Sequence, residues 1–204
     1  MTAKLEARDL TLFRGERCLF NQLSFALNDA ELLVLEGSNG SGKTSLMRAI
    51  AGLLTFDEGS LHWAGQPVKR DRQYFRQQFT WLGHRTGLKH DLTPVENLRF
   101  DSTLRARNDR SFEEVFERLG ITRLATLPVR LLSAGQQRRV ALCRLLLAGT
   151  PLWLVDEPFT NLDRQGRQLV LDLVGEHLAT GGLCIMAAHH DIEVRGTMRR
   201  LQLS

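Results

Sequence analysis

Hydrophobic and polar positions alternate in two segments near the start of the chain, at about residues 5–13 and 18–27. Alternation of this kind is typical of strands with one buried face, and the Arg14-Gly15-Glu16 turn between the segments predicts an antiparallel pair. Later in the chain, continuous apolar runs are typical of parallel strands covered on both faces. These runs are residues 32–35, 152–155 and 183–188. We therefore expect an antiparallel β unit and a central parallel sheet.

Helical periodicity lies between the apolar runs, for example at Val140, Cys143 and Leu147. An alternation of strands and helices predicts an α/β fold. From about residue 84 to residue 133 the pattern changes to helices and loops. We expect a single domain over residues 1–204, with a helical subdomain at about 84–133.

The composition is that of an ordinary globular domain, with 43% hydrophobic and 25% charged residues among 204. No apolar stretch approaches the roughly 20 residues of a membrane span. Glu6 and Asp9 stand where a signal peptide needs apolar residues, so we expect the chain to stay in the cytosol. The net charge is only +4 and the basic residues are scattered, so no nucleic-acid partner is expected.

The three cysteines, Cys18, Cys143 and Cys184, are far apart and form no Cys-x-x-Cys motif. Their number and spacing argue against a disulfide framework or a metal site. We expect them to be buried free thiols, as is typical of a reducing compartment.

A glycine-rich segment directly follows the first apolar run and precedes a predicted helix. Its residues are Gly37, Ser38, Asn39, Gly40, Ser41, Gly42, Lys43, Thr44 and Ser45. The first eight match the P-loop pattern in the strand-to-helix context that makes the match meaningful. The backbone N–H groups of such a loop and the N-terminus of the following helix bind phosphates. We expect Lys43 to reach the β and γ phosphates of ATP, and Thr44 to bind Mg²⁺.

The second apolar run ends in two acids, Asp156 and Glu157. They are predicted to lie at the carboxyl edge of the sheet, where α/β proteins bind ligands. We expect Asp156 to hold Mg²⁺ through water and Glu157 to polarise the attacking water as the general base. Taken alone this motif is weak, because many strands end in solvated acids.

The segment Leu132-Ser-Ala-Gly-Gln-Gln-Arg-Arg139 lies between these two motifs and closely resembles the signature of the ABC (ATP-binding cassette) family. The resemblance implies the P-loop NTPase fold of ABC ATPases, with an antiparallel β subdomain and a helical subdomain. In that family the ATP on one P-loop is sandwiched by the signature of a second subunit. The chain is therefore expected to form a homodimer in which Ser133, Gly135 and Gln136 contact the partner's nucleotide. Ala134 departs from the usual Gly, and we expect this departure to be harmless.

The resemblance covers nearly the whole chain and implies roles for further residues. Phe13 matches the aromatic residue that stacks on adenine, with a place in the core as the alternative. Asp163 matches the loop through which the two subunits sense each other. His189 matches the switch histidine that contacts the γ phosphate, and His190 is the alternative because Asp191 follows it.

His84 stands where ABC subunits usually have Gln, a residue that couples Mg²⁺ and water to the membrane partner. With the Gly83–Lys89 segment, Glu36 before the P-loop and Phe159-Thr160 after the acids, the chain is similar to the ATP-binding subunits of bacterial cytochrome c maturation systems, the haem exporters. That resemblance implies a peripheral ATPase on the cytoplasmic side of the bacterial inner membrane, with integral membrane subunits. In that family, ATP hydrolysis drives the release of a haem-loaded chaperone.

Other interpretations stay open from the sequence. The chain is alternatively the ATPase of an exporter for another cargo, or a soluble ABC ATPase of iron–sulfur assembly. His84 either acts at Mg²⁺, as a neutral hydrogen-bond acceptor, or only borders the contact with the membrane partner. Direct haem binding by His62, His84 or His90 is not expected, because no Cys-x-x-Cys-His motif or paired ligands are evident.

Overall fold

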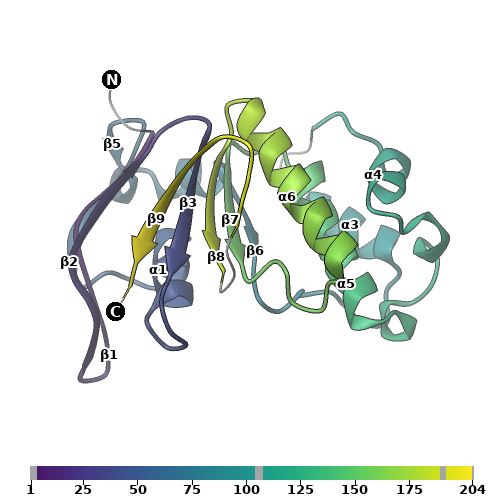
Figure 1. The fold of residues 1–204 in the computed structure, drawn as a ribbon, viewed down its shortest axis with the longest axis horizontal. Helices are drawn as coiled ribbons and strands as arrows, with labels where there is room; N and C mark the ends of the chain where they lie inside the picture. The colour runs from purple at the N-terminus through teal and green to yellow at the C-terminus, as the bar shows by residue number, and fades with distance from the viewer. Residues whose placement is uncertain (1–3, 104–107, 189–191, 204) are drawn as a thin grey trace.

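Two β-sheets form the frame of the molecule in the computed structural model, which describes residues 4–103, 108–188 and 192–203. The antiparallel sheet has the order β2-β1-β4-β5, and the parallel sheet has the order β6-β7-β8-β3-β9 (Figure 1). The strands of the antiparallel sheet are β1 (Leu5–Arg14), β2 (Arg17–Leu27), β4 (Glu58–Trp63) and β5 (Gln66–Pro67). Those of the parallel sheet are β3 (Glu31–Glu36), β6 (Phe79–Leu82), β7 (Leu152–Asp156), β8 (Leu183–Ala187) and β9 (Thr197–Gln202).

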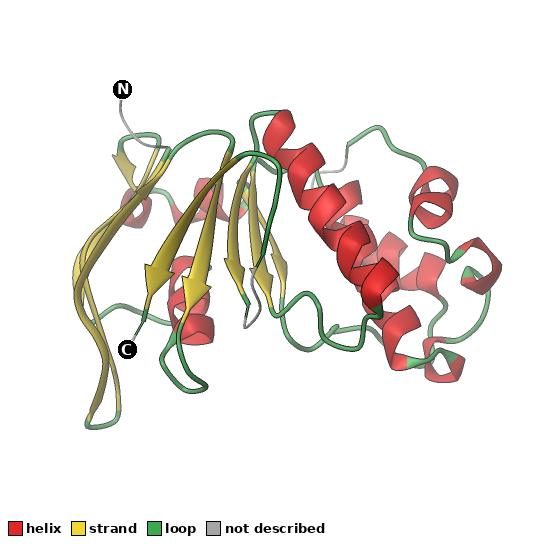
Figure 2. Cartoon of the chain, in the orientation of Figure 1, coloured by secondary structure: helices red, strands yellow, loops and turns green. Residues whose placement is uncertain are grey.

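The helices lie on both faces of the parallel sheet. Helix α1 (Lys43–Ile50) lies between the two sheets, whereas α3 to α6 gather on the opposite face (Figure 2). The remaining α-helices are α2 (Arg72–Arg76), α3 (Pro94–Thr103), α4 (Phe112–Arg118), α5 (Ala134–Leu147) and α6 (Arg164–Ala179). Short 3-10 helices span Val68–Arg70, Thr122–Leu124 and Val129–Leu131.

The parallel sheet divides the hydrophobic core in two because successive side chains of a strand point to opposite faces. Leu33 and Leu35 of β3 pack with α1 and the antiparallel sheet. Leu32 and Val34 of the same strand pack with α5, α6 and the helices of the 84–133 region. A strand that is buried on both faces must be apolar at every position, which explains the continuous apolar runs.

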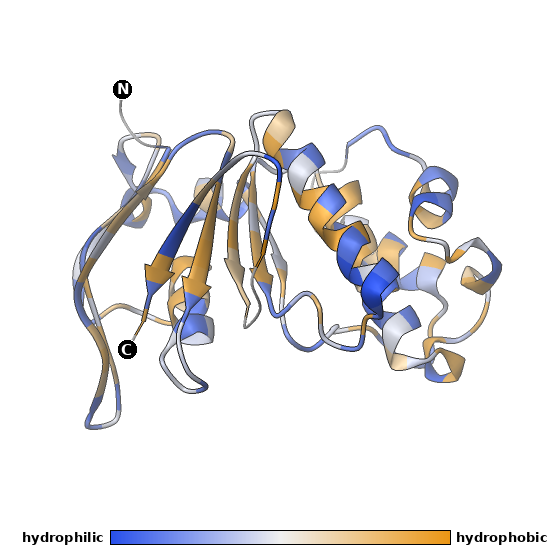
Figure 3. Cartoon of the chain, viewed as in Figure 1, coloured by the Kyte–Doolittle hydropathy of each residue, from blue (hydrophilic) through white to orange (hydrophobic). Residues whose placement is uncertain are grey.

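The predicted α/β fold with an antiparallel and a parallel sheet is confirmed, and the three apolar runs are β3, β7 and β8. The strand pattern did not reveal β4, β5 or β9. Within the part of the chain that the structure describes, β9 is an edge strand that pairs only with β3, and much of it is polar (Figure 3). The expectation for the cysteines is correct for Cys143 and Cys184 but wrong for Cys18, which is exposed near the start of β2. Within the described residues, no helix combines the length and apolar character of a membrane span.

Candidate functional site

The glycine-rich segment forms a tight loop between β3 and α1. Gly37, Gly40 and Gly42 have φ values of 143°, 82° and 102°, a region that side chains other than Gly rarely adopt. A Cβ atom on Gly37 would lie 2.3 Å from the carbonyl oxygen of Leu203. The backbone can therefore wrap this closely only because these positions carry no side chain.

Lys43 begins α1 and its side chain folds back over the loop. Its Nζ donates to the carbonyl oxygens of Gly37, at 2.7 Å, and Ser38, at 3.0 Å. The ammonium is thus held at the N-terminus of a helix, where the helix dipole also attracts anions. The buried hydroxyl of Ser41 has no hydrogen-bond partner among the described residues. A cation, a helix start and an unpartnered hydroxyl in one loop fit the phosphates of a nucleotide.

Asp156 ends β7 beside this loop and is only 2% exposed. Its Oδ1 accepts a hydrogen bond from Thr44 Oγ1 at 3.2 Å. Burial raises the pKa of the Asp156 carboxyl, the Thr44 hydroxyl offsets part of this rise, and the charge of Glu157 adds to it. A buried carboxylate next to a hydroxyl supplies the hard oxygen ligands that Mg²⁺ prefers, and a bound cation would stabilise the ionised form. The residues present fit Mg²⁺.

Glu157 follows β7 in the left-handed region, with φ of 49°. Its N–H donates to the carbonyl oxygen of Ala187 at 2.9 Å. Its Oε2 lies 3.7 Å from Nε2 of His84, in the segment that follows β6. The strands β6, β7 and β8 are parallel neighbours, so their carboxyl ends bring His84, Glu157 and Asp156 to one edge of the sheet.

The signature segment opens α5 with a reciprocal cap. Ser133 Oγ accepts from the N–H of Gln136 at 3.3 Å, and Gln136 Oε1 accepts from the N–H of Ser133 at 2.8 Å. A Cβ atom on Gly135 would lie 2.8 Å from the carbonyl oxygen of Asn161, so this position requires Gly. Ala134, by contrast, is exposed.

An open cavity of about 710 Å³ lies in front of this helix start. Its lining includes Ser133, Gly135, Gln136, Asn161 and Asp163, and among the described residues it includes none of the P-loop. Asp163 also caps α6 by accepting from the N–H of Gly166 at 2.7 Å, and it lies 3.8 Å from Nη2 of Arg139. Within one chain, the signature residues and the P-loop residues therefore lie at separate sites.

Phe13 lies near the end of β1 and is 48% exposed. Its N–H donates to Oδ2 of Asp57 at 2.7 Å, which fixes the backbone while the ring faces solvent. The alternative that Phe13 belongs to the core is wrong. His189, with His190 and Asp191, lies outside the described residues.

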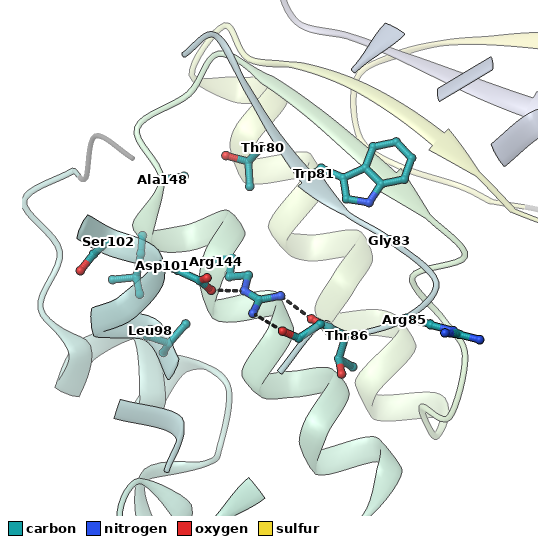
Figure 4. Close-up of a pocket in the computed structure, with 12 residues that line it drawn as sticks. Thr80, Trp81, Gly83, Arg85, Thr86, Leu98, Asp101, Ser102, Arg144 and Ala148 are labelled. Carbon is teal, nitrogen blue, oxygen red and sulfur yellow. Dashed lines mark hydrogen bonds and ion pairs between the residues drawn. The ribbon is translucent and has the colours of Figure 1, made fainter. Parts of the chain in front are cut away.

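A second cavity, of about 340 Å³, lies next to His84 between β6, α3 and α5 (Figure 4). Arg144 of α5 crosses it, paired with Asp101 of α3 and donating to the carbonyl oxygens of Thr86 and Gly87. These bonds attach the segment that follows His84 to the helix that begins with the signature.

The sequence model of the family described as ABC transporter matches residues 20–160. This chain belongs to the ABC transporter family. It is an ABC ATPase, in which ATP hydrolysis is coupled to transport. A Methylococcus capsulatus protein named cytochrome c biogenesis ATP-binding export protein is 45% identical over 204 residues, which cover 99% of each chain.

Two solved structures show the ABC ATPase fold. The ATP-binding subunit of an ABC transporter has a TM-score of 0.84 and 24% identity, and the match covers 92% of this chain and 80% of that chain. A dimeric ATP-binding cassette, described as a post-hydrolysis state bound to ADP and Pi, has a TM-score of 0.78 and 22% identity. That match covers 91% of this chain and 88% of the other.

The structural role of Arg138 in this ABC ATPase could not be predicted from the sequence. The sequence marks Arg138 only as part of the signature segment, yet its guanidinium is buried beneath the carboxyl ends of β6 and β7. Its hydrogen-bond partners are between 18 and 55 positions away, so no local pattern reveals them.

Proposed function

We propose that this ABC ATPase is the ATP-hydrolysing subunit of a membrane export complex in cytochrome c biogenesis. The observation that carries the proposal is the near full-length similarity to the relative from Methylococcus capsulatus, whose name describes that role. The subunit would bind peripherally, on the cytoplasmic side of the bacterial inner membrane, to integral membrane subunits. His84 would link the hydrolysis site to these partners or act at the metal itself.

Within each site, we propose that residues 37–45 bind the phosphates of ATP, with Lys43 on the β and γ phosphates and Phe13 against the adenine. Mg²⁺ held by Thr44 and Asp156 would neutralise charge on the phosphate oxygens. Glu157 would orient the attacking water and take its proton. The pairing of Thr44 with Asp156 and the position of Glu157 one residue further along support this division of roles.

We further propose a homodimer in which Ser133, Gly135 and Gln136 face the nucleotide on the partner's P-loop. Asp163 would lie in the loop through which each subunit senses the nucleotide site of the other, and His189 would contact the γ phosphate. The separation of the signature cavity from the P-loop supports this arrangement, since one chain supplies only half of each site. The dimeric form described for a solved relative also supports it.

The test is complementation of a bacterium that lacks its own cytochrome c biogenesis ATPase. The chain is expressed with the integral membrane subunits of such an export complex, and c-type cytochromes are measured by haem staining of membrane proteins. We expect wild type to restore them and Glu157→Gln to fail at equal expression. Glu176→Gln, an exposed carboxylate on α6, is the matched control and should behave as wild type.

The membrane fraction gives a second readout, because the tagged chain should co-purify with the membrane subunits. A chain that hydrolyses ATP but neither restores cytochromes nor retains those subunits would contradict the export role. It would leave the assignment as an ABC ATPase intact.

A further inference from the structure

Arg138 belongs to the signature segment at the start of α5 and is among the largest fully buried side chains of the described residues, with 2% exposure. Its guanidinium donates only to main-chain oxygens in the hydrogen bonds described. Nη1 donates to Gly83 at 2.7 Å and His84 at 3.4 Å, Nη2 to Asp156 at 3.1 Å and Glu157 at 2.7 Å, and Nε to Pro158 at 3.2 Å. One side chain therefore binds the segments that follow both β6 and β7.

The planar guanidinium suits this position and an ammonium does not. Arg has five N–H donors in a fixed fork, whereas Lys has one rotatable point charge with three donors. Burial lowers the pKa of Arg138 to about 10, and the charges of Asp156 and Glu157 oppose that change. Arg138 is therefore still a cation at neutral pH, placed beneath two acids.

The backbone that Arg138 holds is a strained one. Glu157 is a non-glycine residue with φ of 49°, a conformation that persists only where neighbours enforce it. Its N–H is held by the carbonyl of Ala187 and its own carbonyl by Arg138. Because both peptide groups of Glu157 are held by hydrogen bonds, the direction in which its side chain projects from the backbone is fixed.

The same guanidinium also fixes the other side of the site. It holds the backbone of Gly83 and His84, and the His84 imidazole faces the Glu157 carboxylate at 3.7 Å. The distance between these two side chains therefore depends on one buried group that binds the backbone of both residues.

We propose that Arg138 is a positioning residue that holds the Glu157 carboxylate in place for hydrolysis, by fixing the backbone of Glu157 and of His84 from the helix that begins with the signature. The inference rests on the proposed role of Glu157 as the general base.

The first test compares Arg138→Lys with Arg144→Lys in ATP hydrolysis. Arg144 is the matched control because it lies on the same helix and binds carbonyl oxygens of the same loop, at Thr86 and Gly87, while its ion pair goes to Asp101. A small misplacement of a catalytic group costs up to about 100-fold in rate. We expect Arg138→Lys to lower kcat by about 10- to 100-fold, with KM for ATP within about threefold of wild type. Arg144→Lys should keep kcat within about threefold.

The second test places both changes in one chain and measures single-turnover hydrolysis. If Arg138 acts through Glu157, Arg138→Lys lowers the rate strongly in wild type and by less than about twofold in Glu157→Gln. A role in general stability would lower the rate by the same factor in both backgrounds and would overturn the proposal, as would an unchanged kcat in Arg138→Lys.

Arg138→Gln covers the case in which a buried Lys prevents folding. It removes the charge and keeps an amide donor, and ADP binding with far-UV circular dichroism reports on its fold. We expect the same kcat loss and the same dependence on Glu157. If the Glu157→Gln single variant, with Arg138 unchanged, still hydrolyses ATP, the assignment of Glu157 as the base is refuted instead. Failure of the Arg138 proposal and failure of the proposed function therefore give different results.

Discussion

Asp156 and Glu157 are neighbours in the sequence with different environments. Asp156 is buried against Thr44, and burial raises the pKa of its carboxyl. Glu157 is half-buried and reaches toward His84. The Asp156 carboxylate is thus suited to hold a cation, and the Glu157 carboxylate is suited to contact water. The difference comes from burial, because Asp156 is the last residue of β7 and Glu157 follows the strand.

Asp156→Asn should stabilise the nucleotide-free protein. A raised folded-state pKa means that this carboxyl favours folding below its unfolded pKa and costs stability once pH exceeds its folded pKa. At pH 7 the neutral amide removes this cost, and each kcal/mol removed would raise Tm by about 2–4 °C. Thermal unfolding in EDTA measures it, with exposed Asp29→Asn as control. A lower Tm for Asp156→Asn alone would show that the carboxylate stabilises the fold.

Glu157→Gln should lower ATP hydrolysis by about 100- to 10,000-fold while ATP binding is unchanged, because the amide keeps the shape but cannot accept a proton. Steady-state phosphate release and nucleotide titration measure the two quantities. Glu176→Gln is again the control, and near wild-type hydrolysis by Glu157→Gln would refute the assignment of the base.

At the scale of elements, close approaches of backbone decide where glycine is required. The start of α5 lies so near the loop after β7 that the Cβ of Gly135 would meet the carbonyl of Asn161 at 2.8 Å. Ala134 is exposed. The departure of Ala134 from the family signature is therefore compatible with the helix start.

Gly135→Ala should abolish ATP-dependent turnover, and Ala134→Gly should leave it within about threefold of wild type. The added methyl group forces the loop at 161–163 or the helix start to move, and we expect a stability loss of about 1–3 kcal/mol. ATPase assays and urea unfolding of both variants test this pair. Equal activity in the two would contradict the close approach.

A second contact between elements predicts a pH dependence of stability. The His177 ring of α6 stacks on Trp153 of β7 at 3.9 Å, and its Nε2 lies 3.1 Å from the carbonyl oxygens of Pro151 and Leu183. Burial lowers the pKa of His177, and the two carbonyl contacts offset part of that shift. The imidazole is thus held in its neutral form, with the proton on Nε2.

Stability from His177 should be complete above its unfolded pKa of about 6.5 and be lost as pH falls toward its lower folded pKa. In that window the unfolded chain binds more protons, so the free energy of unfolding decreases as pH decreases. Urea unfolding at pH 7.5 and 5.5 should show a smaller loss in His177→Gln than in wild type. Equal losses in the two proteins would mean that other groups cause the pH dependence.

At the scale of the whole molecule, the P-loop and the signature cavity are separate parts of a 23.1 kDa chain. A nucleotide bound as proposed on the P-loop would therefore leave the signature of its own chain unused. Two chains related by a two-fold axis would use both signatures, and their interface would consist largely of nucleotide and the two signature segments.

Mg-ATP should convert the Glu157→Gln protein from monomer to dimer, because ligands that bind only the dimer shift the equilibrium by mass action. Sedimentation should show the mass rising from 23.1 kDa to twice that value with Mg-ATP, and not with ADP. The Glu157→Gln, Gly135→Ala double variant should stay monomeric. An unchanged mass in Mg-ATP would refute the sandwich arrangement.

Local patterns were sufficient for much of the architecture. The buried strands β3, β7 and β8, the P-loop with its helix, and the helix start at Ser133 were all predictable, because each depends on residues within a few positions of one another. Such features follow from hydrophobic period, backbone conformation and capping. The family resemblance supplied the roles that these local features do not state.

Tertiary structure alone decided the rest. Strand β9 is polar enough to read as loop, and only pairing with β3 makes it a strand. The facing of His84 and Glu157, the burial that separates Asp156 from Glu157, and the five carbonyl contacts of Arg138 join residues far apart in the chain. The order of amino acids specifies which chemical groups are present. Packing determined their distances and solvation, because these depend on which distant segments the core brings together.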